Sequence, residues 1–236
     1  RHHQIDFASG ALVFPGGKVD AADSDPRLRD LCTGVQGLND DELAFRVAGI
    51  REAFEEAGIL LARRRGTADL ITATALKPLE DRYRQALVKG EVTIADMAAS
   101  EDLVLACDTM LPYAHWITPV FVPKRFDTRF FVAVAPVDQV ALHDGHESVD
   151  SIWIRPAQAV DEADAGRHTM LFPTKLNLMK LAELPTVAAV LAHYRTMTPK
   201  PILPVVEQRD GRRFLTIGKE AGYAIYEREM DTSFRG

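Results

Sequence analysis

Apolar residues recur with a helical period between residues 43 and 57. The recurring positions are three or four residues apart and comprise Leu43, Val47, Ile50 and Phe54. Such a stripe is the face that an amphipathic helix buries against a core. Gly58 follows directly, and glycine is the residue that most readily adopts the left-handed conformation at a helix end. The pattern predicts one amphipathic helix that ends at Gly58.

A second helical region is predicted between residues 76 and 99. Its apolar positions again recur at a spacing of three or four and comprise Leu76, Leu79, Tyr83 and Leu87. Lys89 and Gly90 form a stop signal, and Thr93 is expected to cap a further short helix that runs through Met97. We expect this helical insert to cover one side of a substrate cleft.

The remaining segments alternate between predicted strands and helices. Apolar runs bounded by turn signals predict strands over residues 11–14, 116–119, 129–134 and 152–154. We expect the strand at 129–134 to be buried on both faces and the preceding residues 124–128 to form a polar turn. Residues 170–174 are expected to precede a helix that runs through Leu181, and Pro185-Thr186 to start another. Asp210-Gly211, between residues 205–208 and 213–217, predicts a β-hairpin.

The composition is that of one globular domain with a sizeable core. The chain has 236 residues, of which 47% are hydrophobic and 26% charged. No apolar run is long enough for a transmembrane helix, so we expect no membrane partner. The net charge of −6 argues against a nucleic-acid polymer as partner. Cys32 and Cys107 lack the spacing of a disulfide framework or a metal site, so reduced thiols in a cytoplasmic protein are expected.

The chain begins at Arg1, and only ten residues precede the first predicted strand at 11–14. We therefore expect that part of the native N-terminus, including a first strand, is missing.

Three glutamates lie on the opposite side of the first predicted helix. Glu52, Glu55 and Glu56 fall within about 100° of one another on a helical projection. We expect them to face solvent, where three like charges repel each other and a hard divalent cation would remove the repulsion. An ordinary acidic surface helix is the alternative interpretation. The sequence therefore predicts a metal site on this helix.

Residues 51–59 read REAFEEAGI, which fits R-E-x-x-E-E-x-G-hydrophobic, the second half of the Nudix box. Upstream, FPGGK at residues 14–18 resembles the turn that leads from a strand toward the catalytic helix in Nudix proteins. The full box, G-x5-E-x7-R-E-U-x-E-E-x-G-U, places its glycine 14 positions before the arginine, whereas Gly17 and Arg51 are 34 positions apart. About 20 residues are thus inserted, and we expect residues 20–41 to form a surface loop. The position eight before Arg51 is Leu43 rather than glutamate.

The split box, together with HWITP at 115–119 and RFDTRFF at 125–131, resembles the Nudix branch that contains coenzyme A diphosphatases. This resemblance implies an α/β (α+β) fold, in which a mixed β-sheet is sandwiched between helices, with an insertion inside the box and an extra helical insert. We expect a Nudix hydrolase domain over residues 1–198. Residues 199–236 would form a C-terminal hairpin tail, which packs on its own domain or on a second subunit to form a homodimer.

The resemblance also implies roles for individual residues. The expected ligands of Mg²⁺ or Mn²⁺ are the carbonyl of Gly16 and the carboxylates of Glu52, Glu55, Glu56 and Glu147. Arg51 is expected to orient the glutamates by ion pairing. Either Glu147 or Glu52 would take the proton of the attacking water.

Further candidates surround these residues in the sequence. Arg125 or Arg129 is expected to bind a substrate phosphate, since a guanidinium fork suits its oxygens. The alternative is one surface arginine and one arginine paired with Asp127. His143 and His146 offer a zinc alternative, but the sequence supplies no further zinc ligands.

The resemblance implies metal-dependent hydrolysis of a diphosphate linkage in a nucleoside diphosphate linked to another moiety, with coenzyme A or acyl-CoA as one such substrate. The partner would be this small-molecule diphosphate. Two alternatives stay open. One is hydrolysis of ADP-ribose or a dinucleoside polyphosphate, and the other is a Nudix-fold sensor that binds a nucleotide without cleaving it.

Overall fold

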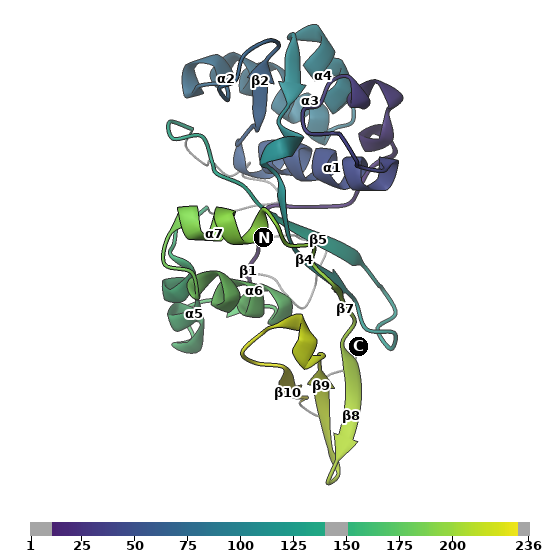
Figure 1. Ribbon diagram of the computed structural model, residues 1–236, viewed down its shortest axis with the longest axis vertical. Coiled ribbons are helices and arrows are strands. Elements are labelled where there is room, and N and C mark those ends of the chain that lie inside the picture. Colours follow the sequence, from purple (N-terminus) through teal and green to yellow (C-terminus); the bar gives the residue numbers. More distant parts are fainter. Residues whose placement is uncertain (1–10, 140–150, 231–236) are drawn as a thin grey trace. The chain divides into compact units, whose positions relative to one another are not determined.

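The computed structural model describes residues 11–139 and 151–230 (Figure 1). The chain forms two compact units, each of which is described by itself. Unit 1 comprises residues 1–110 and 133–153, and unit 2 comprises residues 111–132 and 154–236. In the part of the chain that the structure describes, no helix is long and apolar enough to cross a membrane. The division at residue 198 that the sequence suggested stays a prediction.

Unit 1 holds the predicted amphipathic helix. Its elements are β1 (Ala11–Leu12), the 3-10 helices η1 (Ala21–Ser24) and η2 (Pro26–Arg29), α1 (Asp40–Ala57), β2 (Ala62–Arg64), α2 (Ala73–Leu79), the π-helical turn η3 (Glu80–Arg84), α3 (Gln85–Val88), α4 (Ile94–Ser100), β3 (Leu103–Leu105) and the 3-10 helix η4 (Cys107–Thr109). The strand expected over residues 11–14 is therefore confined to its first two residues.

Helix α1 has well-defined ends. Asn39 and Glu42 form a reciprocal capping box at its start, with the Glu42 N–H donating to Asn39 Oδ1 at 2.8 Å and the Asn39 N–H to Glu42 Oε2 at 3.0 Å. Gly58 ends it in the left-handed conformation, with φ at 66°. The four positions of the apolar stripe are all buried: Leu43, Val47, Ile50 and Phe54. The predicted helix and its end are confirmed.

The segment inserted in the box differs from the expected surface loop. It contains η1 and η2 and buries Asp23, Leu28, Leu31 and Cys32. It also pairs with β3, since the Leu105 N–H donates to the Leu31 carbonyl at 2.7 Å and the Thr33 N–H donates to the Leu105 carbonyl at 2.9 Å. Its apolar residues and these main-chain bonds fix it to unit 1. The prediction was wrong because the many polar residues of the segment are typical of a loop, whereas only a few apolar residues anchor it to the core.

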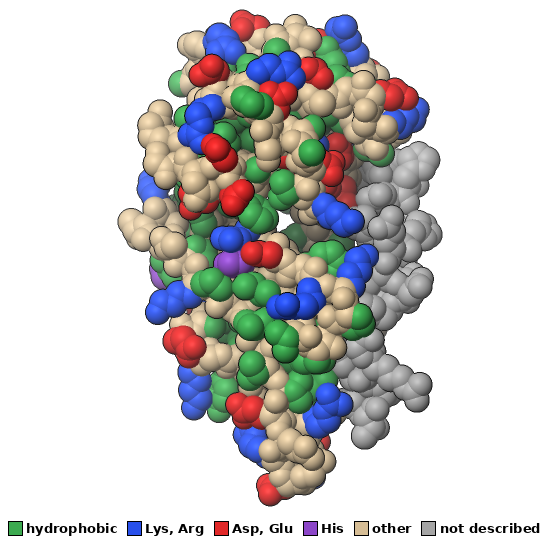
Figure 2. All heavy atoms as spheres, turned by 90° about the vertical axis from the view of Figure 1, so that its right-hand side faces the viewer, with side chains coloured by type: hydrophobic (Ala, Val, Ile, Leu, Met, Phe, Trp, Pro, Cys, Tyr) green, Lys and Arg blue, Asp and Glu red, His purple; other side chains and the backbone are tan. Residues whose placement is uncertain are grey.

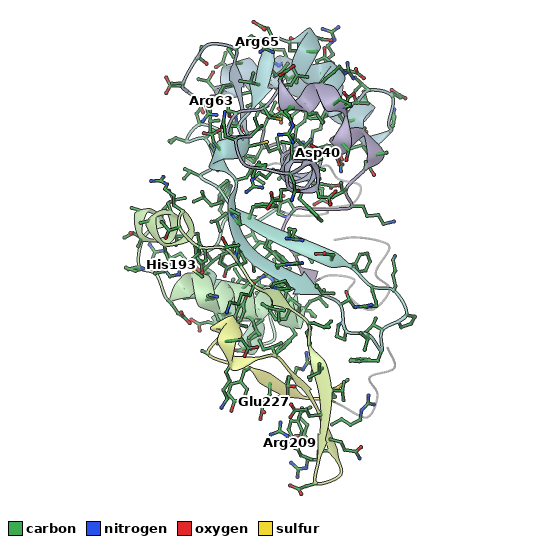
Figure 3. All side chains as sticks on the ribbon, turned by 45° about the vertical axis from the view of Figure 1, so that its right-hand side comes forward. Asp40, Arg63, Arg65, His193, Arg209 and Glu227 are labelled. Atoms are coloured by element: carbon green, nitrogen blue, oxygen red, sulfur yellow. The ribbon has the colours of Figure 1, made fainter. Side chains whose placement is uncertain are left out.

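A side-chain hydrogen bond also holds the same segment, through Thr33. Arg63, labelled in Figure 3, donates through both terminal nitrogens to Asp108, at 2.7 and 2.9 Å, and through Nη1 to Thr33 Oγ1 at 2.9 Å. Arg63 belongs to β2, which pairs antiparallel with β3. Cys32 and Cys107 are both buried and carry free thiols, as expected.

The region between residues 76 and 99 is largely helical, as predicted. α2, η3 and α3 follow one another without a break, and Gly90 then adopts a positive φ of 67°. Thr93 caps α4 through a reciprocal capping box with Asp96. Leu76, Leu79, Tyr83 and Leu87 are buried and attach these helices to unit 1.

Unit 2 contains a mixed three-stranded sheet, helices and a second sheet. Its elements are β4 (Leu111–Ile117), β5 (Asp127–Val132), α5 (Pro156–Asp164), β6 (Thr169–Met170), α6 (Phe172–Ala182), α7 (Val187–Tyr194), β7 (Pro201–Ile202), β8 (Val205–Arg209), β9 (Arg212–Thr216), the 3-10 helix η5 (Lys219–Ala221) and β10 (Glu227–Glu229). The mixed sheet has the order β5-β4-β7, with β5 antiparallel and β7 parallel to β4.

Aromatic side chains and one asparagine form the core of unit 2. Asn177 of α6 is fully buried, and its Oδ1 accepts from Trp116 Nε1 at 3.2 Å and from the Tyr223 hydroxyl at 2.7 Å. The Tyr113 hydroxyl donates to the Asn177 main-chain carbonyl. Because Tyr223 lies between β9 and β10 in sequence, these bonds attach the C-terminal segment to the core of unit 2.

The C-terminal hairpin forms as predicted. β8 and β9 pair antiparallel, and Asp210 and Gly211 both adopt positive φ, at 52° and 78°. β10 adds a third strand beside β9. On one face, Arg209 Nη2 donates to Glu227 Oε2 at 2.7 Å (Figure 3).

In the middle of the chain, one predicted strand is absent and the predicted burial of another is wrong. Residues 152–154 form no strand, and Ile152 and Trp153 are 50% and 67% exposed. β5 was expected to be buried on both faces, but Arg129 is exposed, and Phe130 and Phe131 are only half-buried. Apolar runs of this length do not reveal how many faces a strand buries.

Candidate functional site

The three glutamates in the second half of α1 are buried rather than facing solvent. Glu52, Glu55 and Glu56 are 9%, 8% and 7% exposed, and Arg51 is 7% exposed. The helix therefore carries apolar residues on one side and this charged cluster on the other, and both sides are covered. The expectation of a solvent-facing acidic stripe is wrong, because helical periodicity does not report which distant segments of the chain pack against a helix.

Arg51 is the centre of the cluster and uses all five of its N–H donors. Nε and Nη2 donate to the two carboxylate oxygens of Asp23 at 3.0 and 3.1 Å. Nη2 also donates to the main-chain carbonyl of Lys18 at 2.8 Å. Nη1 donates to Glu52 Oε1 and to Glu55 Oε2, both at 2.9 Å. A guanidinium has five N–H groups in one plane, and these five hydrogen bonds give each of them a partner.

Asp23 is the residue of this cluster that sequence reasoning missed. Counting back from Arg51 gives Leu43 at the place of the first box glutamate. Counting forward from Gly17 gives Asp23, an acidic residue at the sixth position after the glycine, as G-x5-E requires. Asp23 is 1% exposed and forms a bidentate ion pair with Arg51. The extra residues thus lie after the first acidic position of the box, and a forward count would have found it.

The Gly16-Gly17 turn lies against the carboxylates of α1. The Gly16 N–H donates to Glu56 Oε2 at 2.9 Å. At Gly17, an added Cβ would lie 2.2 Å from Glu52 Oε1, so no side chain fits there without moving Glu52. The turn and the helix are 40 residues apart in sequence at the Gly16–Glu56 bond. The fold therefore brings both halves of the split motif together.

The cluster contains more negative than positive charge. Four carboxylates, those of Asp23, Glu52, Glu55 and Glu56, surround the single guanidinium of Arg51. Burial raises the pKa of Glu55 to about 7, with Arg51 opposing the shift and Glu52 adding to it. Burial would lower the pKa of Arg51, but Asp23, Glu52 and Glu55 outweigh it and raise that pKa. Such a cluster favours the binding of additional positive charge.

Comparison with known proteins decides the family. The sequence model of the NUDT19 Nudix domain matches residues 35–181, which is more than half of the chain. The chain belongs to the Nudix family. A Nudix hydrolase from Alicyclobacillus acidocaldarius has a similar fold, with a TM-score of 0.64 at 22% identity over 85% of this chain and 87% of that one. The predicted α/β Nudix fold is confirmed.

Named Nudix relatives are similar at moderate identity. The acyl-coenzyme A diphosphatase NUDT19 of Homo sapiens is 28% identical over 66% of this chain, and that of Gallus gallus is 28% identical over 68%. A Caenorhabditis elegans protein whose name assigns it to the nudix hydrolases is 28% identical over 75% of this chain. The chain spans about half the length of these curated relatives, between 52% and 54%.

The Nudix carboxylates do not converge on one point in this structure. Among the described residues, no group of three or more His, Cys, Asp or Glu side chains is arranged to hold a metal ion. Glu52 and Glu55 each direct an oxygen to Arg51, and Glu56 directs one to the Gly16 N–H. The donor chemistry nevertheless fits a hard divalent cation, since all are carboxylate oxygens beside a main-chain turn. Metal binding then requires a carboxylate to rotate toward the ion.

The remaining predicted site residues fall into two groups. Glu147, His143 and His146 lie outside the described residues. Arg125 and Arg129 belong to unit 2, where Arg125 Nε donates to the Thr118 carbonyl at 3.0 Å and Arg129 Nε donates to Asp127 Oδ1 at 3.2 Å. Both alternatives for these arginines, substrate contact and surface pairing, are compatible with these bonds.

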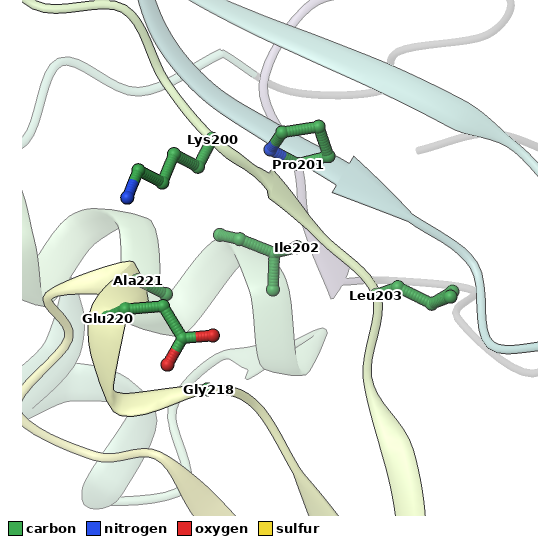
Figure 4. A pocket seen from close by; sticks show the side chains of 7 residues that line it. All are labelled: Lys200, Pro201, Ile202, Leu203, Gly218, Glu220 and Ala221. Carbon is green, nitrogen blue, oxygen red and sulfur yellow. The ribbon is translucent and has the colours of Figure 1, made fainter.

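Unit 2 also contains a cavity of about 200 Å³ (Figure 4). Its charged lining residues are Lys200 and Glu220, and the others are apolar or glycine. This lining offers no set of carboxylates for a metal ion. We therefore assign the candidate Nudix site to the α1 cluster of unit 1, which comprises Arg51, Asp23 and the three glutamates.

Proposed function

We propose that this chain hydrolyses the diphosphate linkage of a nucleoside diphosphate linked to another moiety, in a reaction that requires a divalent metal ion. The observation that carries the proposal is the α1 cluster. A fully bonded Arg51 holds Asp23, Glu52 and Glu55 beside the Gly16-Gly17 turn. Building this arrangement from segments far apart in sequence is costly, because burying charged groups is unfavourable unless they are paired.

Mg²⁺ or Mn²⁺ is the proposed metal. Glu52, Glu55, Glu56 and the Gly16 carbonyl would hold it, and Glu147 is a further proposed ligand. When bound, such an ion neutralises diphosphate charge and lowers the pKa of water. The excess negative charge of the α1 cluster and the raised pKa of Glu55 support this assignment.

The protein groups have separate proposed roles. Arg51 keeps the carboxylates of Glu52 and Glu55 oriented, because its planar fork fixes both at 2.9 Å. Glu52 or Glu147 accepts the proton of the attacking water. Gly17 allows the chain to pass against Glu52, since a side chain there would displace that carboxylate.

Coenzyme A or an acyl-CoA is the proposed substrate. The two vertebrate relatives that share 28% identity are named acyl-coenzyme A diphosphatases. On the face shown in Figure 2, positive and negative side chains are interspersed among the described residues without a broad basic surface, as a small-molecule substrate permits. Arg125 or Arg129 is proposed to bind the 3′-phosphate of coenzyme A, where a guanidinium fork suits the phosphate oxygens.

A substrate panel tests this proposal. Coenzyme A, an acyl-CoA, NADH, ADP-ribose and a dinucleoside polyphosphate would be incubated with the protein and Mg²⁺ or Mn²⁺, and the products followed by ³¹P NMR. We expect cleavage of the CoA compounds into two phosphomonoesters. Brisk cleavage of ADP-ribose alone would refute the CoA assignment but keep the hydrolase. Binding without cleavage of any compound would favour the nucleotide sensor.

The phosphate contact has its own test. Arg125→Gln or Arg129→Gln should raise KM for coenzyme A more than for dephospho-CoA, because only coenzyme A carries the 3′-phosphate. The Arg195→Gln variant provides a control at an exposed arginine of unit 2. Equal effects on both substrates would exclude Arg125 and Arg129 from recognition of the 3′-phosphate.

A further inference from the structure

At the C-terminal end of α1, the Glu55 carbonyl is among those that must be satisfied from outside the helix. The Gly58 N–H donates to the Phe54 carbonyl at 3.0 Å, and the Ile59 N–H reaches back to the Ala53 carbonyl at 3.1 Å. In a continuing α-helix, the Ile59 N–H would instead have bonded the Glu55 carbonyl. The reversal at Gly58 therefore removes the regular main-chain donor of Glu55.

Arg84 supplies the replacement donor. Its Nε donates to the main-chain carbonyl of Glu55 at 2.9 Å. An added Cβ at Gly58 would lie 2.7 Å from Glu80 Oε1 and 3.2 Å from Arg84 Nη1, so both side chains lie over the helix end. A cation at this position also interacts favourably with the negative end of the helix dipole.

Arg84 comes from the helical insert, where it is the last residue of the π-helical turn Glu80–Arg84. Such turns are rare, and within α-helices they occur frequently at functional sites. The turn brings the insert into contact with a residue of the α1 cluster. Glu55 is consequently held twice, at its carbonyl by Arg84 and at its carboxylate by Arg51.

We infer that Arg84 is a positioning residue for the metal-binding carboxylates of α1. The inference rests on the proposed function, because it concerns the same site. By satisfying the carbonyl of Glu55, Arg84 fixes the last turn of the helix, which also carries Glu56. The carboxylates of Glu55 and Glu56 then keep their places beside Arg51 and the Gly16 N–H. The helical insert thereby acts on the site through the main chain of α1.

Metal binding by variants of the whole chain tests this inference. Arg84→Gln removes the charge, and Arg84→Lys keeps the charge but removes the planar fork. Arg82→Gln is the matched control, since Arg82 belongs to the same turn and its side chain is 70% exposed beside Glu101. Mn²⁺ binding would be measured by electron paramagnetic resonance with the metal alone, and thermal unfolding would be recorded in EDTA.

We expect Arg84→Gln to raise the Kd for Mn²⁺ about 10-fold, the scale found for groups that orient metal ligands, and Arg84→Lys to raise it about threefold. Arg82→Gln should bind Mn²⁺ like the wild type. At saturating Mn²⁺, the Arg84 variants should lower kcat more than they change KM, because the substrate contacts remain.

The outcomes separate this inference from the proposed function. Wild-type Kd values in both Arg84 variants would overturn the positioning role, whatever the change in thermal stability. If Arg84→Gln does not fold, Arg84→Lys decides: a raised Kd supports the role and an unchanged Kd overturns it. A wild-type protein that binds no Mn²⁺ would instead refute the proposed function.

Discussion

Replacement of Arg51 by lysine tests whether the guanidinium holds the α1 cluster together. Lysine keeps the charge but offers three donors in place of five, so at least two of the five hydrogen bonds are lost. A hydrogen bond to a charged group contributes about 1.5 to 3 kcal/mol. Asp23 has a side chain with no exposed surface, so water cannot readily replace the lost donors. We expect Arg51→Lys, through the loss of two such bonds, to lower the free energy of unfolding by about 3 to 6 kcal/mol.

The measurement is unfolding in guanidinium chloride at pH 8 with EDTA, followed by circular dichroism. Hydrogen exchange of residues 40–57 would give a local readout, because a chain with two compact units need not unfold in one step. Arg27→Lys is the control, since the Arg27 side chain is 52% exposed and pairs with two aspartates, and it should differ little from the wild type. A loss below about 1 kcal/mol for Arg51→Lys would show that the five bonds do not form in solution.

Four further predictions concern the same site. Glu55→Gln or Glu56→Gln should lower kcat at least about 100-fold, with the fold intact by circular dichroism. Asp41→Asn, at the exposed start of α1, should leave kcat unchanged. Near-full activity of either glutamine variant at saturating metal would refute the assignment of the site. Since metal binds the ionised form of Glu55, whose pKa is about 7, Mn²⁺ binding should release more protons at pH 6 than at pH 8.5, as calorimetry in two buffers would show. The pKa of Glu55 lies above its ordinary value of 4.5, so the stability that protonated Glu55 gives the folded protein at low pH is lost as pH rises through about 7. A metal-free protein whose free energy of unfolding rose over this range would contradict the raised pKa. Gly17→Ala should lower activity and Mn²⁺ affinity, because the added Cβ would lie 2.2 Å from Glu52 Oε1 and displace that carboxylate. Wild-type activity and Mn²⁺ affinity in this variant would show that Glu52 can move without consequence for the site.

The sequence predicted the elements whose signals are local. The apolar stripe and Gly58 defined α1, and Asp210-Gly211 defined the hairpin, because a helical period and a turn with positive φ depend on neighbouring residues. The prediction of a strand at 152–154 was wrong because strand formation depends on residues far away in sequence. A short apolar run forms a strand only where a partner strand is available, and sequence patterns do not supply that information.

The candidate site was predicted in part. Arg51 and the glutamates of α1 were recognisable from their spacing, and the structure places them together in a buried cluster. Asp23 was missed because the insertion separates it from Arg51 by 28 residues. Burial of the glutamates was missed because it depends on segments distant in sequence, such as the Gly16-Gly17 turn that lies against Glu52 and Glu56. The assigned roles of these residues await the experiments above.

The contact between Asp23 and Arg51 joins the two halves of the Nudix signature across the inserted segment. Once the protein has folded, this contact holds the site together even if the peptide chain within the insert is cut. Gly37 lies in an exposed stretch between the anchored residues 31–33 and the helix cap at Asn39. We expect a chain cut at Gly37 to keep its two fragments associated, with the signature completed from two separate polypeptides.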